Sequence, residues 1–151
     1  MATEYLANAE QNVALNNPII MDASIPCTRG NVYHEDGTGI FILRGNVNNY
    51  CANYATYQVV FNGNVAIPAT GTVAPIGVAI TLNGEPRPTS RAIYTPAAVE
   101  TYGNVTSTAI IKVPRGCCFS MAVEYVAASS DPAPTAEITV QNANLTISRI
   151  A

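Results

Sequence analysis

The residues best suited to chemistry are few. The single His of this 151-residue chain stands in His34-Glu35-Asp36, the one cluster of titratable groups. Such a cluster can bind a metal ion or transfer protons, but a lone His needs partners elsewhere. No nucleophile motif or spaced His/Glu set supplies them. The following Asp36-Gly37 instead suits a tight turn. We therefore interpret residues 34–36 as part of a polar hairpin loop.

Paired carboxylates are the second candidate, because glycoside hydrolysis uses two of them in one cleft. Glu85, Glu100 and Glu124 lie near the ends of expected strands. The sequence leaves open that two of them meet, but no motif directs them together. A phosphate cradle is not expected either, because no Gly-rich segment joins a strand to a helix. We predict a protein that is not an enzyme, with no catalytic, cofactor-binding or metal-binding residues and no cofactor.

The chain has four cysteines: Cys27, Cys51, Cys117 and Cys118. The N-terminus has neither the basic nor the apolar region of a secretion signal, so we expect synthesis in a reducing host cytoplasm. Buried free thiols that pack as small apolar residues are the preferred interpretation. A disulfide remains an alternative. A zinc site is a weaker one, because there is no C-x-x-C pair and no nearby His.

The scarcity of charge is the most informative feature. Charged residues make up 11% of the chain, and none occurs in the forty residues from Gly45 to Gly84. This stretch is not a membrane span, because Asn, Gln, Pro and Gly interrupt it. The net charge of -3 and the isolated Arg residues argue against nucleic acid. An uncharged β surface of this size avoids uncontrolled association by packing against identical subunits. We infer a self-assembling structural protein with no nucleic-acid and no membrane partner.

β-Branched residues, Tyr, Gly and Pro dominate, and turn signals recur about every ten residues, which is typical of an all-β fold. The number of strands favours a jelly-roll β-sandwich. We expect strands at 12–21, 24–33, 39–45, 53–61, 64–68, 76–83, 89–95, 98–102, 105–113, 118–127, 135–140 and 144–150. Asp36-Gly37, Asn62-Gly63 and Asn83-Gly84 can each close a hairpin. Residues 1–17 are expected to form an N-terminal arm, and 18–151 the sandwich.

Alternation within the strands predicts which side chains face inward. The predicted core contains Phe41, Val59, Phe61, Ile80, Ile111, Phe119, Met121, Val123 and Ile147. The opposite faces carry uncharged, semi-polar residues such as Thr106, Thr108 and Gln58. That is the composition of a wet but buried subunit interface.

Several segments carry a resemblance to a known family: Y-L-A-N-A-E-Q-N-V at the start, 67–86, 95–100, 111–118 and 140–147. They resemble short proteins encoded in the structural modules of phages and prophages of gut Firmicutes, close to the major capsid gene. The sandwich is also similar to the tumour-necrosis-factor-like jelly rolls that cap collagen-like surface proteins. The resemblance covers most of the chain. It implies a trimeric β-sandwich and a structural role on the capsid surface of a virion.

The resulting hypothesis is a capsid decoration protein. Its partners are two further copies of itself, in a homotrimer, and the major capsid protein of a phage, clamped by the N-terminal arms. Deleting residues 2–11 is then expected to leave a folded trimer that no longer joins the capsid. The alternatives are a receptor- or glycan-binding tip of a head or tail fibre, indicated by exposed aromatic residues at the trimer apex, and a bacterial surface protein. The absence of a collagen stalk and of a secretion signal weighs against the last.

Overall fold

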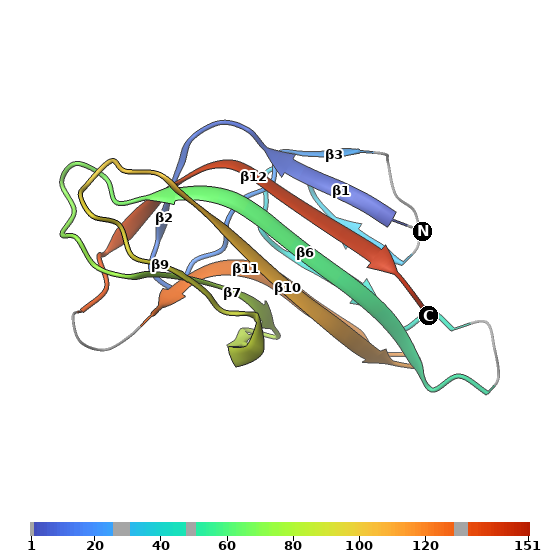
Figure 1. Ribbon diagram of the computed structural model, residues 1–151. Coiled ribbons are helices and arrows are strands. Elements are labelled where there is room, and N and C mark those ends of the chain that lie inside the picture. The colour runs from blue at the N-terminus through green and yellow to red at the C-terminus, as the bar shows by residue number, and fades with distance from the viewer. Residues whose placement is uncertain (1, 26–30, 48–50, 129–132) are drawn as a thin grey trace.

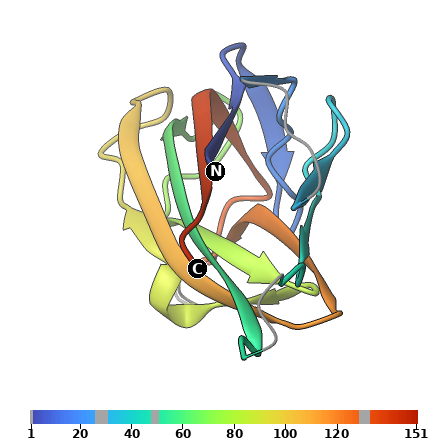
Figure 2. The same cartoon turned by 90° about the vertical axis from the view of Figure 1, so that its right-hand side faces the viewer.

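Two antiparallel sheets pack face to face in the computed structural model, which describes residues 2–25, 31–47, 51–128 and 133–151 (Figures 1 and 2). Sheet A has the order β10-β6-β12-β1-β3, with β2 also pairing with β12. Its strands are β1 (Ala2–Ala7), β2 (Gln11–Ala14), β3 (Ala23–Ile25), β6 (Tyr54–Ala66), β10 (Gly103–Pro114) and β12 (Glu137–Arg149).

Sheet B has the order β4-β5-β11-β7-β8, with β9 also pairing with β7. Its strands are β4 (Val32–His34), β5 (Phe41–Arg44), β7 (Ile76–Leu82), β8 (Glu85–Pro86), β9 (Ala92–Tyr94) and β11 (Cys118–Ala127), and a short 3₁₀ turn, η1, covers Pro88–Ser90. Successive long strands alternate between the sheets, which confirms the predicted jelly roll. Among the described residues, no helix is long and apolar enough to cross a membrane.

The side-chain alternation places the core between the sheets. In β6, Tyr57, Val59 and Phe61 are fully buried, whereas Tyr54 and Gln58 on the opposite face are exposed. Eight of the nine predicted core residues are buried, and Phe119 packs against them while partly exposed. The prediction of the core is therefore confirmed.

Two predicted strand pairs are each one continuous strand. Asn62-Gly63 is not a turn, because both residues lie within β6 and pair with β10. The Asn62 side chain accepts a hydrogen bond from Asn104 Nδ2 at 2.6 Å, so its amide is satisfied across the sheet instead of in a turn. In β12, a register shift between Gln141 and Asn144 replaces the predicted break. Asn142 there has a positive φ of 53°, as expected at a bulge.

The N-terminal segment is not an arm. β1 pairs with β12 on one side and with β3 on the other, and β2 also pairs with β12. Tyr5 is 1% exposed, with its ring 4.7 Å from that of Phe41. The predicted boundary at residue 17 is therefore wrong, because residues 2–14 belong to the sandwich. Thr3, Tyr5 and Ala7 all point toward the core, but Tyr5 is the only large side chain among the three. The alternation is therefore weak in this segment of the sequence.

Other turn predictions are confirmed, and one strand is not. Gly37 has a φ of 85° in the connection between β4 and β5. Asn83 and Gly84 both have positive φ and join the paired strands β7 and β8, as a primed hairpin turn requires. Residues 98–102 form no strand, because the chain turns at Glu100, whose φ is 59°.

A buried hydroxyl in β1 offers a stability test. Thr3 is 1% exposed, and its Oγ1 has no hydrogen-bond partner among the described residues. An unsatisfied buried hydroxyl costs about 1–3 kcal/mol, and Val has nearly the same shape. We expect Thr3→Val to raise the free energy of unfolding by about 1 kcal/mol, measured by urea denaturation. The control Thr72→Val, at an exposed position, should be near neutral; equal gains in both variants would contradict the assignment.

A buried phenol predicts alkaline sensitivity. Tyr125 is fully buried and donates a hydrogen bond to the Thr135 carbonyl at 2.6 Å. Burial raises the pKa of Tyr125 to about 12, above the value of about 10 expected in an unfolded chain. Its contribution to stability is complete below pH 10 and is lost as the pH rises through about 12. Unfolding curves should show this decline, and Tyr125→Phe should make it shallower; an unchanged slope would exclude Tyr125 as its source.

Candidate subunit interface

The outward side of sheet A carries mostly uncharged residues, and we call it the outer face. Residues on neighbouring strands line up in rows across it. One row runs Glu4, Thr146, Val60 and Thr108, and the next runs Leu6, Asn144, Asn62 and Thr106. A third runs Ala2, Ser148, Gln58 and Ile110, and beyond the second lies Gln141, Asn64 and Asn104.

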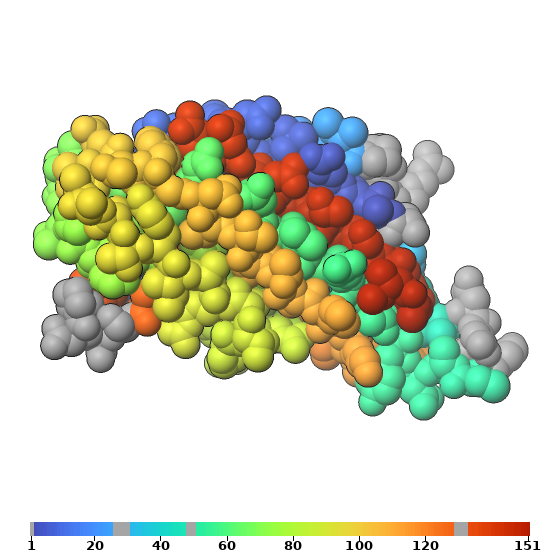
Figure 3. Space-filling model, in the orientation of Figure 1, coloured from blue at the N-terminus to red at the C-terminus, as the bar shows by residue number. Residues whose placement is uncertain are grey.

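Charged residues are few on this face. They are Glu4 in β1, Glu137 in β12 and Lys112 in β10. Figure 3 shows the face with β1, β12, β6 and β10 running side by side across the molecule. If another protein covered this face, few charged groups would lose their contact with water. Desolvation of charged groups is the usual obstacle to burying a surface.

The amides on the outer face already satisfy one another. Asn104 Nδ2 donates to the oxygens of Asn62 at 2.6 Å and Asn64 at 3.3 Å. Thr106 donates to Asn104 Oδ1 at 3.3 Å, and Asn144 Nδ2 donates to the Glu4 carboxylate. Because these groups have partners within the sheet, covering them would leave fewer unsatisfied polar atoms.

Apolar side chains are spread among these polar ones. Ile110 is 55% exposed and Ile25 is 56% exposed, while Leu6 and Val60 are half-buried. This mixture, with large apolar groups dispersed among amides and hydroxyls, is typical of a wet protein–protein interface. It confirms the sequence-based description of the outward residues as uncharged and semi-polar.

The edge strand β10 is covered by another part of the chain. Arg87 donates to the Ile110 carbonyl at 2.9 Å, and Ser107 donates to the Ser90 carbonyl. An exposed edge invites strand addition, so this cover makes the β10 edge less open to pairing with another chain.

His34 is a packing residue. Its ring stacks on Phe41 at 4.1 Å, with 7° between the planes, and meets the Tyr5 ring edge-on at 5.0 Å. Its Nδ1 and Nε2 lie 3.1 Å and 3.3 Å from the carbonyls of Ile40 and Met21. Both ring nitrogens therefore face main-chain acceptors at the start of the β4–β5 hairpin. This agrees with the interpretation of residues 34–36 as part of a polar hairpin loop.

The three carboxylates singled out from the sequence lie in different surroundings. Glu124 accepts a hydrogen bond from Thr81 at 2.8 Å, and Glu85 lies in the two-residue strand β8. Glu100 instead lines a cavity of ≈ 400 Å³ with Glu10 and Glu137. Only long-range contacts bring these three together, so no local pattern in the sequence indicates the group.

The carboxylates around this cavity act on a neighbouring phenol. Tyr102 donates a hydrogen bond to Glu10 at 3.0 Å. Partial burial raises the pKa of Tyr102, and the bond to Glu10 adds to the shift. Across the described ranges, no group of three or more His, Cys, Asp or Glu side chains is arranged to hold a metal ion.

The predicted burial of the cysteines is wrong for the described residues. Cys117 and Cys118 form no disulfide, as expected, but Cys51, Cys117 and Cys118 are all exposed. Cys117 ends the turn after β10, and Cys118 is the outward-facing first residue of β11, so neither reaches the core. Cys27 lies outside the described residues.

The exposed tyrosines do not form one stacking surface. Tyr33 lies in β4, Tyr54 begins β6, and Tyr102 precedes β10 at the other end of sheet A. Tyr50 lies outside the described residues. The described part of the chain therefore provides no aromatic cluster of the kind that a glycan-binding surface needs.

Comparison with known proteins shows the fold. No protein-family model matches the chain, and neither does any curated protein. Among solved structures, the chain is similar to the globular domain of a zebrafish complement 1qA protein, with 12% identity, a TM-score of 0.64, and coverage of 99% of this chain and 96% of the other.

Two further solved structures are similar in the same way. The Eiger TNF of S. frugiperda has 10% identity and a TM-score of 0.69, with 100% of this chain and 92% of the other covered. Murine APRIL at pH 5.0 has 9% identity and a TM-score of 0.62, with 99% and 98% covered. At these identities the likeness concerns the fold alone, which is the predicted tumour-necrosis-factor-like jelly roll.

Proposed function

We propose that this chain is a non-enzymatic structural or binding module that assembles as a homotrimer through the outer face of sheet A. The observation that carries the proposal is the scarcity of charge on that face, where Glu4, Lys112 and Glu137 are the charged residues of the strands. The hydrogen bonds among the polar side chains of the outer face also lower the free-energy cost of burying that face.

A closed ring explains why such a face would not cause unlimited association. When a face of one subunit packs on a different surface of the next subunit, repeating this contact builds up an assembly. The assembly is a ring if the rotation between neighbouring subunits closes after a whole number of copies. The sequence resemblance to tumour-necrosis-factor-like jelly rolls implies three subunits. A standard interface buries about 800 Å² per partner, which a sheet of six strands can supply.

The finer part of the proposal is that the trimer decorates a phage capsid. Its support is the sequence resemblance to proteins of phage structural modules. Because β1 is built into sheet A, the N-terminal segment cannot act as a free clamp on the major capsid protein. Binding to a capsid would therefore use another surface of the folded trimer.

Two measurements test the proposal separately. Sedimentation at micromolar concentration should give the mass of three chains, and a stable monomer would contradict the assembly. Purified particles induced from a lysogen that carries this gene should contain the polypeptide, detected by mass spectrometry. Its recovery from washed cell envelopes instead of particles would contradict the virion role and favour a bacterial surface protein.

A further inference from the structure

The short turn η1 has a cation on each side of it. Arg87 directly precedes η1, and Arg91 directly follows it. The turn packs against β7 and β10, and it is the coiled ribbon beside these strands in Figure 1. Arg87 is half-buried and Arg91 is exposed. Two guanidinium groups are therefore presented from one short segment.

A cavity of ≈ 250 Å³ lies beside this segment, and we call it the η1 cavity. Its lining includes Arg87 and Arg91, together with Asn16, Ala79, Pro86 and Val126. Ala79 and Val126 are buried, at 1% and 7% exposed, but they do not belong to the core cluster between the sheets. They lie on the outward side of sheet B, so the cavity combines an apolar wall with two cations.

A buried serine anchors the segment that carries the two cations. Ser90 is 3% exposed, and its hydroxyl accepts a hydrogen bond from the Ile80 amide at 3.0 Å. The same hydroxyl donates to the Arg87 carbonyl at 2.7 Å. The Ser90 carbonyl also accepts a hydrogen bond from Ser107. Because these bonds hold η1 against the sandwich before any ligand arrives, binding there has a lower ordering cost.

Most N–H donors of the two guanidinium groups have no partner in the described part of the chain. Arg87 donates through Nη1 to the Ile110 carbonyl at 2.9 Å. The Nη1 of Arg91 lies 3.3 Å and 3.5 Å from the carbonyls of Ala127 and Ala128. A guanidinium group has five N–H donors, so Nε and Nη2 of each residue remain for a ligand.

No carboxylate of the described residues neutralises these two cations. Neither Arg87 nor Arg91 forms an ion pair within the described ranges. Glu124, which lies opposite Ala79 in the strand register, accepts a hydrogen bond from Thr81 at 2.8 Å and does not line the cavity. The η1 cavity therefore offers two positive charges to an anion from outside the subunit.

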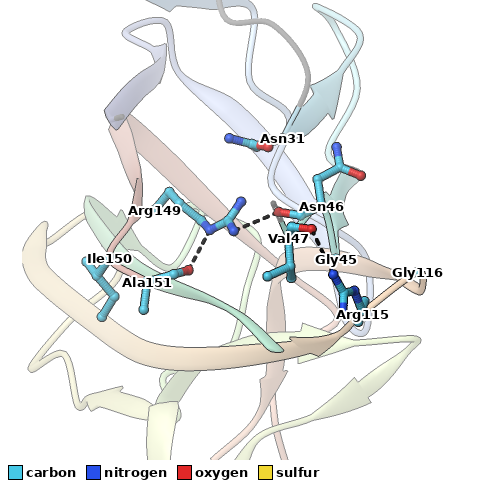
Figure 4. Close-up of a pocket in the computed structure, with 9 residues that line it drawn as sticks. All are labelled: Asn31, Gly45, Asn46, Val47, Arg115, Gly116, Arg149, Ile150 and Ala151. Carbon is cyan, nitrogen blue, oxygen red and sulfur yellow. Dashed lines mark hydrogen bonds between the residues drawn. The ribbon is translucent and has the colours of Figure 1, made fainter. Parts of the chain in front are cut away.

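The larger cavity near the C-terminus does not offer donors in this way. It has a volume of ≈ 870 Å³, and its lining includes Arg149. Arg149 already donates to the carbonyls of Ala151 and Asn46, at 2.6 Å and 2.7 Å (Figure 4). Both acceptors belong to residues of the same lining, so this guanidinium group is bonded within the wall of its cavity.

We propose that the η1 cavity binds a carboxylate group carried on a short carbon chain, with Arg91 as the main donor and Arg87 as the second cation. The Nε and Nη2 of Arg91 can donate two parallel bonds to a carboxylate, in the fork that a guanidinium group favours. Ala79 and Val126 offer apolar surface to the carbon chain. A cavity of ≈ 250 Å³ suits a small organic acid or one acidic side chain of a partner protein.

The lining favours a carboxylate over a phosphate. Phosphate sites typically use a cradle of unbonded main-chain N–H groups. Here the amide of Arg87 donates to the Ile80 carbonyl at 2.9 Å, and that of Arg91 donates to the Pro88 carbonyl at 3.3 Å. Pro86 and Pro88 have no amide N–H at all. The donors that remain are the side chains, which suit a planar anion.

The test is an NMR titration of the intact protein at constant ionic strength, adjusted with chloride. N-acetylglutamate N-methylamide represents an acidic side chain, and glutarate represents a free organic acid. N-acetylglutamine N-methylamide is the uncharged control, and inorganic phosphate is the competing anion. We expect saturable shifts of the Arg91 Nε–H and of the Val126 and Ala127 amides with a carboxylate probe.

The tighter of the two carboxylate probes identifies the source of the carboxylate. Three results would overturn the proposal. They are the absence of a saturable shift with either carboxylate, equal binding of the glutamine control, and tighter binding of phosphate.

Substitutions give a second measurement. Arg91→Lys keeps the charge but removes the fork, and we expect it to weaken carboxylate binding about tenfold. Arg91→Gln removes both and should weaken binding further. Because Arg91 is exposed, both variants should keep the thermal transition of the intact protein. The control Arg115→Gln removes a positive charge from the β10–β11 turn, outside the cavity, and should leave the affinity unchanged. Equal affinity of Arg91→Gln and Arg115→Gln would show that the η1 cavity is not the binding site.

Discussion

Val60→Glu should convert the assembled protein into folded monomers. Val60 lies near the middle of the outer face, between Thr146 on β12 and Thr108 on β10. In an assembled trimer the new carboxylate would be buried without a partner, and such a charge costs about 3–5 kcal/mol. At each interface this corresponds to a loss of association of about 100-fold or more. Sedimentation should show a single subunit with native β-sheet circular dichroism.

The control for this experiment places the same charge on the other sheet. Tyr33 is 53% exposed and lies in β4 of sheet B. Tyr33→Glu should leave the mass of the assembly unchanged. Thr108→Glu, at a position exposed in the single subunit, should dissociate the trimer without straining the fold. If Tyr33→Glu dissociates the protein and the two outer-face variants do not, the interface lies on sheet B.

Deleting residues 2–7 should unfold the protein, in contrast to the arm hypothesis. The deletion removes the strand between β12 and β3 and takes Tyr5 out of the core. Truncating one large buried aromatic costs about 3–5 kcal/mol, and typical domains are stable by about 5–15 kcal/mol. Losing the strand as well exposes two sheet edges. We expect loss of the cooperative thermal transition.

Single substitutions separate the two interpretations of the N-terminal segment. Tyr5→Ala should lower the free energy of unfolding by about 3–5 kcal/mol. Glu4→Gln on the outward side of the same strand should change it by about 0.5 kcal/mol or less. A truncated chain that melts at the temperature of the intact protein would mean that residues 2–7 are dispensable, as an arm would be.

Local patterns were sufficient where the strands are long and strongly alternating. The range of β11 was predicted without error, and in β10 Ile111 was correctly placed inward and Thr106 and Thr108 outward. The same reasoning failed at Asn62-Gly63, where a turn signal lies inside β6. The turn propensity of Asn-Gly reflects only these two residues. In the folded chain, Asn62 pairs with Thr106 on one side and Asn144 on the other, and this pairing holds the backbone extended.

The site residues show the same division. His34 was correctly placed at a hairpin, because Asp36-Gly37 is a local signal. Cys117 and Cys118 were expected in the core on residue type alone, yet both are exposed at the end of the β10–β11 turn. Their exposure depends on where that turn lies relative to β5, which no local pattern contains.

The sequence alone determined that the protein is an all-β sandwich with an uncharged outward surface. This follows because side chains alternate with a period of two along every strand, whatever the neighbouring strands are. The tertiary structure decided that residues 2–7 are a central strand, that Glu10, Glu100 and Glu137 share one cavity, and that Arg149 lies beside Asn46. These contacts join residues from opposite ends of the chain, such as Ala2 and Ser148, and only the pairing order of the strands fixes them.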